Sequence, residues 1–249
     1  MSHARLLRAT ALIALLAALA SGEEISSHAG KTPAENSELS ARVDLRPRFA
    51  EWRLTQRSQG ERGTCSVFAT VEAVEFALAN CTGTGEHLSV EFANWAANSA
   101  TGRKDDGDFF HNIIRGISKF GICPERAMPY EQEFAPTREP SADAFAEAAR
   151  IREKHDIAFH WIRKWSAKPG LEESDIAKVK SVLASGFPVS AGSYHSLLFV
   201  GYEDNASLPG GGRFIVADSE GRERYLDYAA TMKRMSDLFW VSASLKAAQ

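Results

Sequence analysis

Cysteine is scarce in this chain, and the spacings that would commit it to a metal are missing. Three of the 249 residues are cysteine and seven are histidine, and none follows the paired spacing of a zinc site. The chain also lacks a glycine-rich phosphate loop, an internal repeat and a heptad pattern. Its net charge of −3 offers nucleic acid no electrostatic attraction. We therefore expect no metal, no cofactor and no nucleic-acid partner.

An apolar run opens the chain, but it is too short to anchor the chain stably in a bilayer. Two arginines precede the run Ala9–Ala20, and its last residues fit the small-residue rule for signal-peptide cleavage. The run predicts a signal peptide over residues 1–20; an N-terminal helix or anchor is the alternative. The mature chain would then begin at Ser21, be secreted or periplasmic, and make no membrane contact.

Three segments of different character follow this run. Residues 21–41 are polar and small, which is typical of a disordered linker and not of a folded pro-domain. Residues 42–135 carry helical patterns, and residues 136–249 add short apolar runs bounded by turn residues. This order predicts an α+β fold, with a helical half, an antiparallel β half and a site in the cleft between them.

Capping residues and glycines predict where individual elements begin and end. One helix should start at Cys65, a second should be capped by Ser89, and a third should end at Gly121. A later helix should be capped by Ser174 and end at Gly186. The strands expected in the second half are 157–165, 187–192, 195–203 and 212–219.

The odd number of cysteines bears on their pairing. In an exported chain an odd count suggests one free thiol. The economical assignment joins Cys81 to Cys123 in a disulfide and leaves Cys65 free. The alternative is that all three are reduced and buried.

Cys65 stands where a polar, glycine-punctuated stretch meets an apolar helical pattern, in SQGERGTCSVFATVEAVEFAL. The unpaired N–H groups of a helix N-terminus stabilise a thiolate, which is the nucleophilic form of cysteine. His195 begins an apolar strand and Asp218 ends the next one, so antiparallel pairing would bring imidazole and carboxylate together. The three residue types suit a nucleophile, a base and a group that orients the base. Taken singly, each type is more often structural.

Six segments resemble papain-like cysteine peptidases, in that family's order from Val43 to Gly221. QGERGTCSVFA resembles the active-site segment, in which Gln-Gly-x-x-Gly-x-Cys leads into Phe-Ala. The other five segments are VDLR, LSVEF, FGICPERAMPYE, HSLLFVGY and FIVADSEG. The resemblance implies a divergent, bacterial-type member with the papain-like fold and a peptide or protein substrate. No exposed apolar pattern stands out, so we expect a monomer.

The resemblance also implies roles for particular residues. Cys65 matches the nucleophile, His195 the general base and acid, and Asp218 the position of the family's orienting asparagine. Gln59 matches the side chain that donates to the oxyanion, with the Cys65 backbone N–H as the second donor. Gly107 falls near the glycines that pair with the substrate backbone; a plain turn is its alternative.

Several departures from the family pattern keep other functions open. Arg62 replaces a cysteine of the family's disulfide, while Ser66 and Glu220 replace tryptophans. The short segment before His195 also makes the second half similar to double-glycine leader peptidases and transglutaminase-like enzymes. The leading hypothesis is an exported peptidase that forms a thioacyl-enzyme. The alternatives are a transglutaminase-like acyl transferase or amidase, and a catalytically silent papain-like binding protein.

Overall fold

The computed structural model describes residues 39–247, with the backbone alone at residues 222 and 223. The expected signal peptide and nearly all of the expected linker therefore lie outside the described residues. The helices are α1 (Arg46–Glu51), α2 (Cys65–Thr82), α3 (Val90–Thr101), α4 (Phe110–Phe120), α5 (Ala142–Lys154), α6 (Glu173–Ala184) and α7 (Tyr228–Arg234). The strands are β1 (Arg42–Asp44), β2 (His155–Arg163), β3 (Val189–Gly192), β4 (Leu197–Asp204), β5 (Gly212–Asp218), β6 (Arg222–Asp227) and β7 (Asp237–Leu245).

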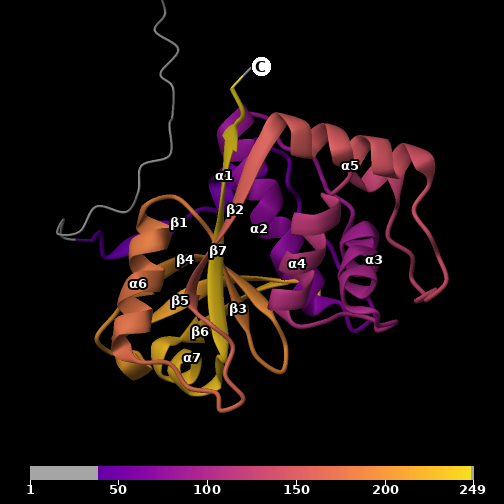
Figure 1. Ribbon diagram of the computed structural model, residues 1–249. Helices are drawn as coiled ribbons and strands as arrows, with labels where there is room; N and C mark the ends of the chain where they lie inside the picture. Colours follow the sequence, from indigo (N-terminus) through magenta and orange to yellow (C-terminus); the bar gives the residue numbers. More distant parts are fainter. Residues whose placement is uncertain (1–38, 248–249) are drawn as a thin grey trace, which may run out of the picture.

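The strands of this described part form one antiparallel sheet. Its order is β2-β7-β3-β4-β5-β6, with β1 added beside β4. Helices α2 to α5 gather at one end of the molecule, whereas α6 and α7 lie beside the sheet at the other (Figure 1). The predicted α+β architecture, helical first and antiparallel β second, is confirmed. No helix within residues 39–247 has the length and apolar character needed to cross a membrane.

Strand β4 shows why the second half carries continuous apolar runs. Leu198 and Val200 belong to the core that contains α2, α3 and α4, whereas Leu197 and Phe199 belong to the core that contains α6. Successive side chains of a strand point to opposite faces. A strand that is covered on both faces therefore has no polar face, and β4 is apolar from Leu197 to Val200 without a polar residue between.

Helix α2 is the central helix, and it is buried along almost its whole length. It begins at Cys65, as predicted, and ends at Thr82, where Gly83 caps it in the left-handed conformation with a φ of +75°. The Ser89 hydroxyl accepts a hydrogen bond from the Phe92 N–H, and Gly121 follows the last residue of α4. These boundaries are confirmed. The expected Ser174 cap is wrong, because Glu172 caps α6 in a reciprocal capping box with Asp175.

The expected disulfide between Cys81 and Cys123 is wrong, because all three cysteines are free. Cys123 is fully buried in a small core with Phe92 and Met128, beneath α5. Burial raises the pKa of the Cys123 thiol to about 12. The structure places this residue as a small apolar side chain and leaves Cys81 on the last turn of α2.

Glu72, on α2, is a buried carboxyl group whose Oε1 has no hydrogen-bond partner among the described residues. It lines a cavity of about 250 Å³ between α1 and α2. Burial, with a smaller contribution from the Glu75 carboxylate, raises the pKa of Glu72 to about 8. A raised carboxyl pKa means that the folded state keeps its proton while the unfolded state loses it. Holding Glu72 protonated therefore lowers the free energy of unfolding as the pH rises. This loss of stability is absent below about pH 4.5 and grows until about pH 8.

We expect Glu72→Gln to remove this pH-dependent cost. Between about pH 5 and about pH 7, the unfolding free energy of the wild type should fall relative to the variant by up to about 1.4 kcal/mol per pH unit. Urea unfolding of both proteins across this range measures the difference. Glu153→Gln, on the exposed face of α5, is the matched control and should run parallel to the wild type. Parallel curves for wild type and Glu72→Gln would contradict the prediction.

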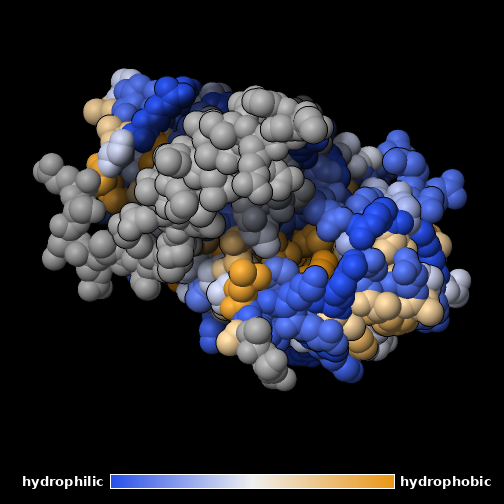
Figure 2. Space-filling model, turned by 90° about the horizontal axis from the view of Figure 1, so that it is seen from above, coloured by the Kyte–Doolittle hydropathy of each residue, from blue (hydrophilic) through white to orange (hydrophobic). Residues whose placement is uncertain are grey.

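Seen from above, the surface is largely hydrophilic, with hydrophobic residues gathered near the centre of the view (Figure 2). The exposed large apolar side chains in the described part of the chain are few and include Phe109, Trp165 and Tyr194. All three line a single cavity, which lies beside Cys65.

Candidate active site

The loop that precedes Cys65 is fixed from both halves of the molecule. Ser58 forms an isolated antiparallel bridge with Glu220, and the Gln59 N–H donates to the Ser219 carbonyl at 2.7 Å. At the end of the loop the Thr64 and Tyr130 hydroxyls lie 2.7 Å apart and share a hydrogen bond. The thiol at the first position of α2 is therefore held in a defined place against the β half.

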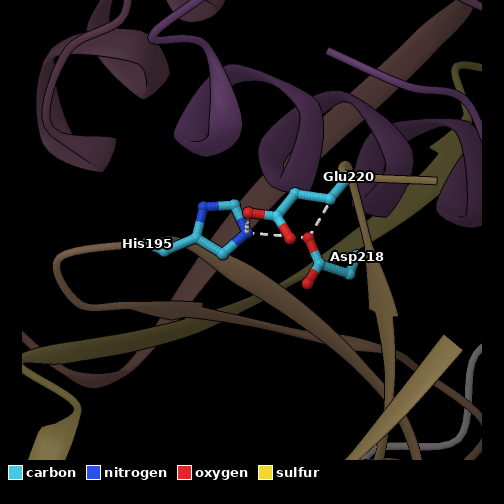
Figure 3. A group of neighbouring side chains, drawn as sticks. All are labelled: His195, Asp218 and Glu220. Carbon is cyan, nitrogen blue, oxygen red and sulfur yellow. Dashed lines mark hydrogen bonds and ion pairs between the residues drawn. The ribbon is translucent and has the colours of Figure 1, made fainter. Parts of the chain in front are cut away.

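His195 and Asp218 meet because β4 and β5 pair as neighbouring antiparallel strands. His195 lies just before β4, while Asp218 is the last residue of β5, in the register that pairs Leu198 with Ala217. The His195 Nε2 lies 2.7 Å from Oδ1 of Asp218, whose side chain is fully buried (Figure 3). The sequence-based expectation that pairing would bring these two side chains together is confirmed.

The Cys65 sulfur lies beside the same imidazole. The Ser196 N–H donates a hydrogen bond to Cys65 Sγ at 3.4 Å. Burial alone would raise the pKa of the Cys65 thiol, but hydrogen bonds from His195 and Ser196 outweigh it, and the pKa is lowered. Because Nε2 of His195 faces Asp218, Nδ1 is the ring nitrogen available to the sulfur. The arrangement favours a thiolate beside an imidazole that a carboxylate holds in place.

Gln59 is buried with its side-chain amide fixed at both ends. Its Nε2 donates to the Arg62 carbonyl at 2.6 Å, and its Oε1 accepts from the Ser219 hydroxyl at 2.6 Å. An amide nitrogen carries two hydrogens, so one N–H of Gln59 remains for another acceptor. The side chain is thus oriented before any ligand arrives.

Arg62 joins the loop before Cys65 to the segment that contains Gly107. Its guanidinium is buried and binds Glu91 at 2.6 Å and Asp106 at 2.8 Å. Gly107 has a φ of +91°, and a Cβ there would lie 2.1 Å from the Gly63 carbonyl oxygen. Only glycine permits this close approach. Gly107 therefore packs directly against the loop that carries the thiol, and it lines the same cavity as Cys65.

Two charged residues near His195 were not expected from the sequence as part of the site. Glu220 Oε1 lies 4.0 Å from His195 Nε2, and the Glu220 N–H donates to Asp218 Oδ1 at 3.0 Å (Figure 3). Arg224 forms ion pairs with both the Asp218 and the Glu220 carboxylates. The sequence signal that could have found them is the spacing of Asp218, Glu220 and Arg224, which puts three charged residues in or beside the short connection between β5 and β6. Sequence reasoning treated Glu220 only as the loss of a tryptophan.

His195, Asp218 and Glu220 also have the composition of a metal-binding group. Their ligand atoms lie within 4.8 Å of one another. Arg224 already supplies a positive charge to both carboxylates. The negative charge of the two carboxylates is therefore balanced by a guanidinium. Asp218 Oδ1 is already engaged in a hydrogen bond with the His195 imidazole.

A cavity of about 290 Å³ opens beside Cys65 and is lined from both halves of the chain. The helical half supplies Gly63, Cys65 and Gly107, and the β half supplies Gly192 and Ser196. The Cys65 thiol therefore lies at the wall of a cavity between two structural halves, a common position for a ligand site.

Comparison with known proteins identifies the fold. The chain matches no family model and no curated protein in sequence. Among solved structures it is similar to xylellain, a cysteine protease from Xylella fastidiosa, with 19% identity over 86% of this chain and 90% of the other, at a TM-score of 0.63.

Two further structures agree with this match. The digestive procathepsin L 3 of Tenebrio molitor larval midgut has 18% identity over 87% of this chain and 75% of the other, at a TM-score of 0.60. The ragweed pollen allergen Amb a 11, a cysteine protease in its proform, has 18% identity over 84% and 67%, at 0.56. The chain therefore has the papain-like cysteine protease fold, as its sequence predicted.

Proposed function

We propose that this chain is a cysteine peptidase in which Cys65 is the nucleophile, His195 the general base and acid, and Asp218 the group that orients His195. The observation that carries the proposal is the position of His195, with Nε2 held 2.7 Å from Asp218 and the thiol of lowered pKa on its other side. The fold alone leaves the chemistry open, because binding proteins can share it.

The first half of the reaction forms an acyl-enzyme. The Cys65 Sγ attacks the carbonyl carbon of the peptide bond, and the thiol proton resides on His195 Nδ1. The oxyanion that forms accepts hydrogen bonds from the free N–H of Gln59 and from the Cys65 backbone N–H. The C–N bond then breaks, His195 donates its proton to the leaving amine, and a thioester remains.

The second half releases the acid. Water enters where the amine left and gives a proton to His195 as its oxygen attacks the thioester carbon. The C–S bond breaks, the carboxylic acid leaves, and the thiol is restored. Asp218 keeps Nε2 protonated throughout, so that Nδ1 always faces the reacting atoms. The reaction needs no redox partner, because it exchanges only protons and acyl groups.

The test is labelling with a thiol-directed peptidyl epoxide at neutral pH, with mapping of the modified residue by mass spectrometry. We expect one label per chain, on Cys65, and none on Cys81 or Cys123. Cys65→Ala should remain unlabelled while keeping the circular dichroism spectrum of the wild type. A folded protein whose Cys65 resists the reagent would contradict the proposal and favour a binding protein with this fold.

Product analysis separates peptide hydrolysis from acyl transfer. A peptidase yields a free carboxylic acid even when an added primary amine competes with water. Quantitative transfer to the amine without hydrolysis would instead assign a transglutaminase-like reaction. We also propose that the chain is exported to the periplasm or the medium, supported by the apolar run Ala9–Ala20; a chain recovered there that still begins at Met1 would argue against cleavage.

A further inference from the structure

The cavity beside Cys65 contains a buried acidic residue. Asp237, the first residue of β7, is only 3% exposed and lines this cavity. Gly192 lies opposite it in the β3–β7 pair, and a Cβ at position 192 would lie 1.8 Å from Asp237 Oδ1. The missing side chain of Gly192 therefore provides the space that the carboxylate occupies.

Asp237 has no partner for its charge, unlike most buried carboxylates of this protein. Glu75, Glu91, Asp175 and Asp218 each form an ion pair with an arginine. Within residues 39–247, no hydrogen bond or ion pair reaches the Asp237 side chain. Burial raises the pKa of Asp237 to about 6. A desolvated carboxylate of this kind gains most from a cation that enters the same cavity.

The walls of the cavity suit the long body of a cationic side chain. Phe109 and Trp165 stand at its rim, 47% and 45% exposed, with their ring centroids 5.3 Å apart. Aromatic rings contact the methylene stem of such a side chain and attract its positive charge. The volume of about 290 Å³ is at the small end of ligand pockets, which suits one side chain better than a whole ligand.

The charges of the whole lining, Asp237 included, are negative on balance. Asp105, Asp108 and Asp237 supply three negative charges and Arg103 one positive charge, which gives −2. Arg103 is held by Asp105 at 2.8 Å and by Asp108 at 3.2 Å, so it is already neutralised. The potential in the cavity therefore favours a cation.

We propose that this cavity takes an arginine or lysine side chain of the substrate, and that Asp237 is the residue that selects it. The proposal rests on the proposed function, because Cys65 lines the same cavity and fixes the bound side chain close to the scissile bond. An apolar side chain would leave the Asp237 carboxylate buried without a partner. A guanidinium or ammonium group satisfies it and gains contact with the two aromatic rings.

The test uses internally quenched peptides that vary at one position at a time, over the three positions on either side of the scissile bond. At each position the peptides carry arginine, citrulline, lysine or norleucine. Arginine is compared with citrulline, and lysine with norleucine, because each pair differs mainly in charge. At one position we expect kcat/KM to favour the charged residue by roughly tenfold to hundredfold. In Asp237→Asn that preference should fall to roughly threefold or less, with peptides that are neutral there cleaved at least as well as by the wild type.

Two controls make the result specific. Asp156→Asn makes the same charge change on β2, outside the cavity, at a carboxylate that is 69% exposed, and it should keep the preference. Binding of the same peptides to Cys65→Ala, measured by calorimetry, tests selection without catalysis. Equal binding and cleavage of arginine and citrulline peptides by proteins with Asp237 would overturn the proposal, as would a preference unchanged in Asp237→Asn. Charge-selective binding without any cleavage would uphold the cavity and reject the peptidase.

Discussion

His195→Ala is expected to lower kcat/KM for peptide hydrolysis by roughly 10⁵-fold, because nucleophile and base act as a unit. In the proposed mechanism, the variant lacks the group that takes the thiol proton and returns it to the leaving amine. It also lacks the hydrogen bond that lowers the pKa of Cys65, so burial of the sulfur then acts unopposed by the imidazole. Alkylation of Cys65 by iodoacetamide should accordingly shift to higher pH in the variant. Both effects are measured on the same protein, by peptide assay and by a pH series of alkylation rates.

A second histidine supplies the matched control. His155 begins β2, and its ring bonds the Ile151 carbonyl at 3.1 Å, away from the cavity beside Cys65. His155→Ala should keep both the activity and the alkylation profile. More than about 1% of wild-type kcat/KM in His195→Ala would show that another group serves as the base. An unchanged alkylation profile would show that His195 does not influence the thiol.

Local sequence signals were sufficient for the elements that carry the candidate nucleophile and its partner. The start of α2 at Cys65 follows from a polar loop that meets an apolar helical pattern, and the cap of α3 follows from Ser89. The closeness of His195 and Asp218 follows from two consecutive strands that form a hairpin. Each of these features depends on neighbours in the sequence, so pattern and turn chemistry were enough to predict it.

The features that sequence reasoning missed depend on contacts between distant segments. Strand β7 lies between β2 and β3 in the sheet although it is the last strand of the chain. The resemblance to papain-like peptidases ended at Gly221, before β6, α7 and β7. Asp237 reaches the cavity only because β7 pairs with β3 and because Gly192 leaves room. Neither fact has a signature in the nine residues of β7 itself.

The disulfide prediction failed for a related reason. Counting cysteines assumes that the spare thiols pair, but Cys123 is instead a core residue packed with Phe92 and Met128. The resemblance indicated that Arg62 replaces a disulfide cysteine of the family. The structure shows that ion pairs of Arg62 take the place of that disulfide. Arg62 ties the loop before Cys65 to Asp106 and to Glu91 on α3, so an ionic contact joins these segments without a covalent bond.

Arg62→Met is expected to destabilise the protein by about 3–5 kcal/mol, because it leaves two carboxylates without their partner in a largely buried site. Burial alone would lower the pKa of Arg62, but the hydrogen bonds that its guanidinium donates to Asp106 and Glu91 raise it, so the guanidinium stays charged. Urea unfolding at constant pH measures the loss. Arg126→Met is the control, since Arg126 pairs with Glu86 and Glu147 at the surface with its side chain 57% exposed, and it should lose less than about 1 kcal/mol.

A double variant distinguishes loss of the ion pair from loss of the arginine's packing against Tyr130, whose ring centre lies 4.5 Å from the guanidinium carbon. Arg62→Met combined with Glu91→Leu removes one of the stranded carboxylates and should recover part of the stability lost in the single variant. The loop from Gly60 to Cys65 would remain loosened in both proteins, so kcat/KM should stay low even where stability returns. Glu91→Leu alone gives the reference loss of stability. If Glu91→Leu costs the same in Arg62→Met as in the wild type, the two side chains are not coupled. The ionic tie would then be a consequence of the fold and not a support of the site.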